Sequence, residues 1–183
     1  MSDKRKATHQ LLLLRHAKSS RNIPSTPDHE RPLSKRGRKA AQVMGRVMRS
    51  EDLVPDLVLA STARRAMETL EALEPWAEQP ILDAKKALYL ASAPSMLDLL
   101  RNLNETAQSV LLIGHNPGLH ALAVLLVGAH SKAAERKLAK RLAKSYPSGT
   151  LAEFALACPW SQIEEGSGRL VRFVTPRELK ALA

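Results

Sequence analysis

Short aliphatic runs alternate along this chain with longer segments of helical periodicity, and this alternation constrains the fold more than any other feature. Five runs are expected to be strands, and three of them are almost continuously aliphatic, which is typical of strands covered on both faces. The expected strands are 10–14, 56–60, 109–113, 150–157 and 169–174. The pattern predicts an α/β fold, a three-layer sandwich with a mostly parallel sheet and helices on both faces.

Five helices are expected between these strands. The first should begin after Ser34, a residue type that favours the N-cap position, and its inward face is predicted at 40, 43, 44, 47 and 48. The others should start soon after residue 61, follow Pro94, run from about 119 to 127, and cover 131–144. In the last, Ala134, Leu138 and Leu142 are the predicted apolar stripe, and six Lys or Arg residues lie among the other positions.

The length of 183 residues predicts one domain over 1–183, with 1–8 flexible. A hydrophobic content of 44% with 25% charged residues is typical of a globular protein. The lone cysteine, Cys158, cannot form an internal disulfide, which favours a reducing compartment. The longest apolar stretch, 119–129, is shorter than the roughly 20 residues that a membrane span needs. We therefore expect a cytoplasmic protein that does not enter the membrane.

The net charge of +10 favours an anionic partner, which could be nucleic acid, anionic lipid, or an anionic small molecule or protein. The positive residues are scattered, with enrichments at 35–39 and 132–144, so they could also serve solubility alone. A nucleic-acid-binding module that uses the basic helix 131–144 is a competing hypothesis. An aromatic content of 3% and the lack of any nucleic-acid-binding motif argue against this hypothesis and against nucleic acid as a partner.

Polar residues follow three of the predicted strands at the edge where ligands bind in parallel sheets. Arg15 and His16 follow the first strand, 61–65 follow the second, and 114–118 follow the strand at 109–113. If these strands are neighbours, two histidines and at least two arginines converge. Burying like charges together is costly unless an anion neutralises them, and a guanidinium fork suits the oxygens of a phosphoryl group. A phosphate ion is therefore expected in this pocket.

A histidine in such a pocket can act as a nucleophile. Imidazole attacks phosphorus only in its neutral form, and neighbouring arginines lower the pKa of the ring. The product would be a phosphohistidine, which water hydrolyses. The arginines and the second histidine would stabilise negative charge on the transferring group. A position just after a strand also predicts that the His16 side chain faces solvent.

Five segments together resemble the histidine phosphatase superfamily, and within it the small SixA-like phosphohistidine phosphatases. They are Leu-Leu-Arg-His-Ala-Lys-Ser-Ser at 13–20, Arg-Pro-Leu-Ser-Lys-Arg-Gly at 31–37, Ser-x-x-x-Arg-Ala-x-x-Thr at 61–69, Leu-Tyr-Leu at 88–90 and Gly-His-Asn-Pro-Gly at 114–118. The similarity covers nearly the whole chain and implies a phosphoglycerate-mutase-like fold. It also implies a phosphatase that needs neither cofactor nor metal.

The resemblance implies catalytic roles for four residues. Arg15 and Arg65 would bind phosphate, His16 would be the nucleophile, and His115 would complete the pocket, while Arg64 would point elsewhere. The alternatives are a helix-surface ion pair for Arg65, a helix cap for His115, and a catalytically silent docking protein.

Two further residues are candidates for substrate binding. Asn22 falls where the related mutase branch has a phosphate-contacting asparagine, and the Ser19 hydroxyl lies close to the nucleophile in sequence. Ordinary hydrogen bonding within a loop would explain both residues equally well.

The related alcohol phosphatases use a carboxylic acid to protonate the leaving oxygen, and no recognisable motif supplies one here. Asp83 and Glu105 are the only candidates that the sequence suggests. An alkoxide needs such an acid, whereas an imidazole leaves as a neutral ring. The sequence therefore favours phosphohistidine on a protein, with an acidic phosphotransfer domain as partner. The alternative is a small phosphorylated substrate, either a phosphoester or a phosphoramidate.

Overall fold

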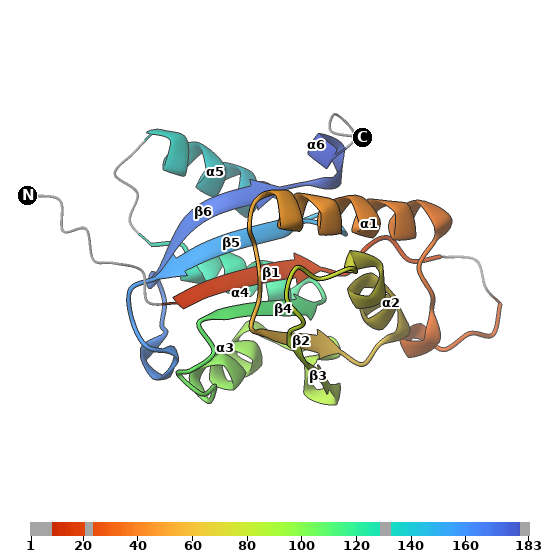
Figure 1. The fold of residues 1–183 in the computed structure, drawn as a ribbon, viewed down its shortest axis with the longest axis horizontal. Helices are drawn as coiled ribbons and strands as arrows, with labels where there is room; N and C mark the ends of the chain where they lie inside the picture. Colours follow the sequence, from red (N-terminus) through yellow and green to blue (C-terminus); the bar gives the residue numbers. More distant parts are fainter. Residues whose placement is uncertain (1–8, 21–23, 129–132, 180–183) are drawn as a thin grey trace, which may run out of the picture.

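The computed structural model describes residues 9–20, 24–128 and 133–179 of the chain. Its six strands form one sheet in the order β3-β2-β4-β1-β5-β6 (Figure 1). The strands are β1 (His9–Arg15), β2 (Leu57–Ser61), β3 (Ile81–Lys85), β4 (Ser109–Gly114), β5 (Leu151–Leu156) and β6 (Gly168–Val174). The pairings β3-β2, β2-β4 and β4-β1 are parallel, whereas β5 runs antiparallel to both β1 and β6. The mostly parallel sheet predicted from the sequence is confirmed.

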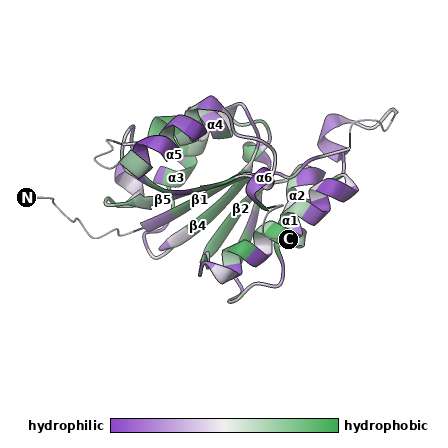
Figure 2. Cartoon of the chain, turned by 90° about the horizontal axis from the view of Figure 1, so that it is seen from above, coloured by the Kyte–Doolittle hydropathy of each residue, from purple (hydrophilic) through white to green (hydrophobic). Residues whose placement is uncertain are grey.

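Helices cover both faces of the sheet (Figure 2). Those on one face are α1 (Lys35–Ser50), α2 (Arg64–Leu73) and the short α6 (Pro176–Leu179), and those on the other are α3 (Ala93–Arg101), α4 (Gly118–Leu126) and α5 (Ala133–Lys144). Three 3-10 turns lie between these elements: η1 (Asp28–Glu30), η2 (Lys86–Leu88) and η3 (Trp160–Gln162). The three-layer sandwich is therefore confirmed.

The central strand β1 explains why the fold has two hydrophobic cores. Its four consecutive leucines are at most 1% exposed, and side chains of a strand alternate between the two faces of the sheet. Leu11 and Leu13 belong to the core beneath α3, α4 and α5, whereas Leu12 and Leu14 belong to the core beneath α1 and α2. The aliphatic run at 10–14, which predicted a strand buried on both faces, therefore forms β1.

Helix α1 holds the segment that follows β1. The Ser34 hydroxyl accepts a hydrogen bond from the Gly37 N–H (3.0 Å), so the predicted N-cap is confirmed. The Ser34 N–H and hydroxyl both donate to the carbonyl oxygen of Lys18, at 2.9 and 3.0 Å. A Cβ on Gly37 would come within 2.0 Å of the same oxygen, so only glycine allows this approach. The segment after His16 is thereby fixed against the start of α1.

Two expectations were incomplete or wrong in detail. Strand β3 was not predicted, because it forms an edge of the sheet with Ile81 71% exposed and therefore carries no buried aliphatic run. In α5, Leu142 is buried and Leu138 partly buried as predicted, but Ala134 is exposed because only the C-terminal part of the helix packs on the core.

The predicted flexibility of residues 1–8 concerns residues outside the described part of the chain. Within that part, no helix is long and apolar enough to span a membrane.

Candidate active site

A cleft of about 380 Å³ opens at the carboxyl ends of β1, β2 and β4. The parallel register of β1 and β4 places Arg15 opposite Gly114, so His16 and His115 follow side by side. Their rings lie 5.0 Å apart, between centroids. The cleft is lined by Arg15, His16, Lys18, Ser19, Asp28, Arg31, Arg65, Leu90, His115, Asn116 and Ser148. The convergence expected from the three strand ends is therefore present.

Arg15 lines this cleft and has one hydrogen-bond donor without a partner. Its Nη1 donates to the carbonyl oxygen of Tyr146 (2.8 Å), which also accepts from Asn116 Nδ2 (3.0 Å). The Arg15 Nε atom is buried and has no partner among the described residues. Burial and the neighbouring Arg65 lower the pKa of Arg15. A partly buried guanidinium with an unsatisfied donor is suited to receive an anion.

The His16 ring is held in one tautomer. Its Nδ1 lies 2.7 Å from the carbonyl oxygen of Ala17, which can only accept, so Nδ1 carries the proton. Its Nε2 therefore carries no proton, and the lone pair on this atom accepts a hydrogen bond from Arg65 Nε at 3.3 Å. Burial, together with the charges of Arg65 and Arg15, lowers the pKa of His16 to about 4. His16 is 7% exposed, so the expectation that it faces solvent was wrong.

Arg65, in the first turn of α2, connects the groups of the cleft. It is 2% exposed, and its Nη1 donates to the backbone carbonyl of Asp28 (2.6 Å). Its Nη2 lies 3.0 Å from Asp28 Oδ2 and 3.4 Å from His115 Nδ1. The alternative of a helix-surface ion pair with a neighbouring glutamate is therefore wrong. As expected, Arg64 points elsewhere, because its Nε pairs with Glu68 (2.8 Å).

His115 points into the cleft rather than capping α4. Its Nδ1 accepts from Arg65, so the proton is on Nε2, which donates to the Ser61 hydroxyl at 2.7 Å. Burial is the main cause that lowers the pKa of His115 to about 3, and the charges of His16 and Arg65 add to it. Both histidines are therefore neutral at physiological pH.

Helix α2 also fixes the backbone around the cleft. The Thr69 hydroxyl accepts from the N–H of Ala17 at 3.0 Å and donates to the carbonyl of Arg65, one turn earlier in the helix. The carboxylate of Glu68 accepts from the N–H of Leu33 at 2.8 Å. The Arg-Ala-x-x-Thr pattern thus ties Arg65 and the segment after β1 to the same helix.

The sequence did not identify Asp28, the acidic residue that lines the cleft. Its Oδ2 accepts from the hydroxyl of Tyr89 (2.7 Å) and from Arg65, and its Oδ1 pairs with Arg31 Nη2 (2.6 Å). The hydrogen bond from Tyr89 is the main cause that lowers the pKa of Asp28. Asp28 lies three residues before the Arg-Pro-Leu-Ser segment, and Tyr89 is the centre of Leu-Tyr-Leu. The position of Asp28 and Tyr89 in or next to these two family segments was the sequence signal that could have identified them.

The two acids that the sequence suggested lie elsewhere. Asp83 is on the edge strand β3 and pairs with Lys85 at 2.7 Å. Glu105 accepts from the backbone N–H groups of Trp160 and Ser161, at 3.0 and 3.1 Å. Neither residue lines the cleft, because β3 is at the sheet edge and Glu105 precedes β4 at its opposite end. Their selection as nearby acids was wrong.

The remaining predicted residues divide in two. Ser19 lines the cleft and forms an isolated β-bridge with Leu33, whereas Asn22 lies outside the described residues. Within the described part of the chain, no group of three His, Cys, Asp or Glu side chains could hold a metal ion.

Comparison with known proteins identifies the family to which this chain belongs. The family model described as histidine phosphatase superfamily (branch 1) matches residues 11–85. An uncharacterized protein of Mycobacterium tuberculosis (strain ATCC 25618 / H37Rv) is 32% identical over 164 residues, which cover 90% of this chain and 100% of the relative. The chain belongs to the histidine phosphatase superfamily.

Solved structures place this histidine phosphatase among the SixA-like members. A protein of Agrobacterium tumefaciens assigned as the phosphohistidine phosphatase SixA is 27% identical, with a TM-score of 0.76 and coverage of 92% of this chain and 98% of the other. Its counterpart from Nakamurella multipartitia is 25% identical, with a TM-score of 0.79 and coverage of 92% and 96%. The chain is therefore a phosphatase with the phosphoglycerate-mutase-like fold.

Proposed function

We propose that this phosphatase removes the phosphoryl group from phosphohistidine on a protein, through a covalent intermediate on His16. One observation carries the proposal: the His16 ring is neutral, with its proton held on Nδ1 by the Ala17 carbonyl and its Nε2 lone pair facing Arg65, which also lines the cleft. A neutral imidazole nitrogen in an arginine-lined pocket has the form that a nucleophile for phosphorus requires.

In the first step, the Nε2 lone pair of His16 attacks phosphorus while the bond from phosphorus to the leaving atom breaks. Arg65 occupies that lone pair in the free enzyme, at 3.3 Å, so the arriving phosphoryl group draws the guanidinium onto its own oxygens. Arg15 and Arg65 bind those oxygens, and positive groups already in place are the main protein contribution to phosphoryl transfer. His115 lines the same volume, and the bound phosphoryl anion favours protonation of its Nδ1, which then donates to the same oxygens.

In the second step, water attacks phosphorus and the bond to His16 Nε2 breaks. The phosphorylated ring keeps its Nδ1 proton, because the Ala17 carbonyl at 2.7 Å stabilises it. The ring therefore leaves phosphorus as a neutral imidazole, and the protons released by water pass to phosphate and solvent. The same hydrogen bond thus serves the attack in the first step and the departure in the second.

The reaction is proposed to need no metal, since two guanidinium groups supply the positive charge that Mg²⁺ provides in many phosphoryl-transfer enzymes. Arg65 is buried and Arg15 is partly buried beside His16, where charges are less screened than at the surface. Activity should therefore be the same with a chelator as with added divalent ions.

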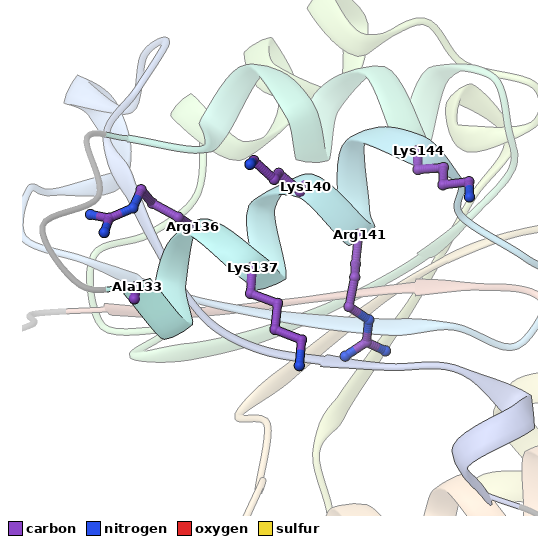
Figure 3. A pocket seen from close by; sticks show the side chains of 6 residues that line it. All are labelled: Ala133, Arg136, Lys137, Lys140, Arg141 and Lys144. Carbon is purple, nitrogen blue, oxygen red and sulfur yellow. The ribbon is translucent and has the colours of Figure 1, made fainter.

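The basic face of α5 supports a protein substrate. Five cationic side chains extend from this helix: Arg136, Lys137, Lys140, Arg141 and Lys144 (Figure 3). The chain continues from α5 directly into the loop that contains Tyr146, whose carbonyl holds Arg15, and Ser148, which lines the cleft. An acidic protein bound along α5 would therefore lie beside the pocket. Such complementary charge raises association rates and is weakened by salt.

The proposal is tested by parallel turnover of a phosphohistidine phosphotransfer protein, phosphoimidazole, an aryl phosphate and glycerol phosphate, at low and moderate salt with chelator. We expect P–N bonds to be cleaved about 10²–10⁴-fold faster than unactivated P–O bonds, which is the usual contribution of general acid catalysis. His16→Ala should abolish all turnover, and Cys158→Ser, distant from the cleft, is the matched control. Equal cleavage of glycerol phosphate would favour the alternative, a small-molecule phosphatase.

A further inference from the structure

The cleft contains one carboxylate among its described lining residues, and it is placed unexpectedly for a site that binds a phosphoryl group. Asp28 pairs with Arg31 and Arg65, and Arg15 lines the same cleft. A carboxylate there opposes the binding of an anion, so it needs a reason to be present. Holding Arg65 in place explains only part of it, because Arg65 Nη1 is also bound by the backbone carbonyl of Asp28 at 2.6 Å.

Asp28 is held as an anion with capacity to accept another hydrogen bond. Tyr89, Arg65 and Arg31 each donate to its oxygens, at 2.7, 3.0 and 2.6 Å. A carboxylate has about four lone-pair sites, so about one remains. The Asp28 side chain is 47% exposed and lines the cleft, so a substrate group can reach it. A carboxylate held in the ionised form accepts hydrogen bonds from neighbouring N–H and O–H groups. It does not readily donate a proton.

We propose that the Asp28 carboxylate recognises a nitrogen leaving group, by accepting the N–H of the imidazole ring that departs from phosphorus. This inference rests on the proposed function. A phosphorylated imidazole reacts in its protonated form, in which the ring nitrogen remote from phosphorus carries a proton and the ring is positive. Asp28 stabilises that cation, so it favours the reactive form of the substrate within the cleft.

The step balances without a further reactant. The bond from His16 Nε2 to phosphorus forms, and the bond from phosphorus to the substrate nitrogen breaks. The electron pair of the broken bond stays on that nitrogen, so the ring leaves as a neutral imidazole that still carries its N–H hydrogen-bonded to Asp28. No proton is transferred to the leaving atom. The substrate and His16 thus have the same arrangement, each with its remote N–H held by an oxygen: Asp28 on one side and the Ala17 carbonyl on the other.

An alcohol ester meets the opposite situation in this cleft. Its leaving oxygen gains negative charge and needs a proton, which an ionised carboxylate cannot provide. Repulsion between the leaving oxygen and Asp28 raises the barrier further. The same residue therefore favours P–N cleavage and disfavours P–O cleavage, so it acts as a specificity determinant.

The test measures kcat/KM for phosphoimidazole and for an aryl phosphate in the wild type, Asp28→Asn and Tyr89→Phe. In Asp28→Asn we expect the ratio of the two rates to fall about 10- to 100-fold, the usual contribution of a hydrogen bond to a charged group. Tyr89→Phe removes a donor from the same cluster but leaves the carboxylate, so its ratio should stay close to that of the wild type. Asp83→Asn, on the edge strand, is the surface control. A ratio in Asp28→Asn equal to that of the wild type would overturn the inference.

The affinity for inorganic phosphate separates leaving-group recognition from mere positioning of Arg65. Removing the negative charge of Asp28 should tighten phosphate binding, whereas loss of a residue that only positions Arg65 should weaken it. Weaker binding in Asp28→Asn, with both substrates slowed equally, would contradict the inference even if the variant is less stable. Melting temperatures of all variants report whether they are folded.

The outcomes also separate this inference from the proposed function. Cleavage of phosphoimidazole without cleavage of the phosphoprotein would contradict the protein substrate, while the ratio in Asp28→Asn would still decide the role of Asp28. Cleavage of both, with an unchanged ratio, would contradict the role of Asp28 alone. Cleavage of neither would overturn both.

Discussion

Acidification should destabilise this protein well before its carboxylates titrate, because the cleft keeps two histidines neutral. In the unfolded chain both rings have a pKa near 6.5, whereas in the folded protein the pKa of His16 is about 4 and that of His115 about 3. Between these values the unfolded state binds protons that the folded state does not. The free energy of unfolding therefore falls as the pH falls from 6.5 towards 4.

The expected size follows from the pKa differences. Between about pH 8 and about pH 5, each histidine ring lowers the free energy of unfolding by about 2 kcal/mol. The two rings together lower it by about 4 kcal/mol. That is a large share of the roughly 5–15 kcal/mol that stabilises a typical domain. The carboxylates contribute little in this range, because the pKa values of Asp28 and Glu68 are lowered and these groups stay ionised.

The assay is urea-induced unfolding followed by circular dichroism at several pH values, in the wild type, His16→Gln and His115→Gln. Each variant has one ring fewer to protonate, so its loss of stability over the same range should halve, to about 2 kcal/mol. Saturating phosphate should also reduce the loss, because a bound anion favours the protonated rings. A stability that stays constant from pH 8 to pH 5, or a loss that is the same in the variants, would refute the burial of two neutral histidines.

Three further predictions concern single features. Arg65→Lys should lower kcat/KM about 100-fold or more in steady-state assays, because one ammonium cannot replace a guanidinium fork; near-normal turnover would show that the fork is dispensable. The pair Lys137→Glu and Lys140→Glu should raise KM for the phosphoprotein at low salt but not for phosphoimidazole, and an equal effect on both would argue against docking along α5. Gly37→Ala should lower the melting temperature, since its Cβ would meet the Lys18 carbonyl oxygen at 2.0 Å; an unchanged value would contradict this close contact.

Much of the fold could be predicted because its signals are local. The continuous leucines of β1 indicated a strand buried on both faces, and Ser34 indicated the start of α1. Strand β3 could not be predicted, because an exposed edge strand needs no aliphatic run and is defined by its pairing with β2. The antiparallel direction of β5 and β6 was also not specified by their sequences, since direction depends on how the chain returns to the sheet.

In the candidate site too, residues with a local sequence signal were predicted and residues brought in by long-range contacts were not. His16, Arg65 and His115 could be found because each directly follows a strand or begins the next helix, at the edge where parallel strands place ligands. Asp28 was harder to find, because it lies in the 3-10 turn η1 rather than after a strand and its contact with Tyr89 joins residues 61 positions apart. The choice of Asp83 and Glu105 failed for the same reason: position along the chain does not give distance in the fold.

The most direct test of the account is to trap the covalent intermediate. Wild-type protein mixed with substrate labelled on phosphorus and quenched at early times should carry the label on His16, as an acid-labile and alkali-stable phosphoramidate found by peptide mapping. His115→Gln should change the rate but not the labelled residue, whereas His16→Ala should carry no label. Label on Cys158 or on a serine, or no label at any early time while phosphate is released, would contradict the central claim that His16 is the nucleophile.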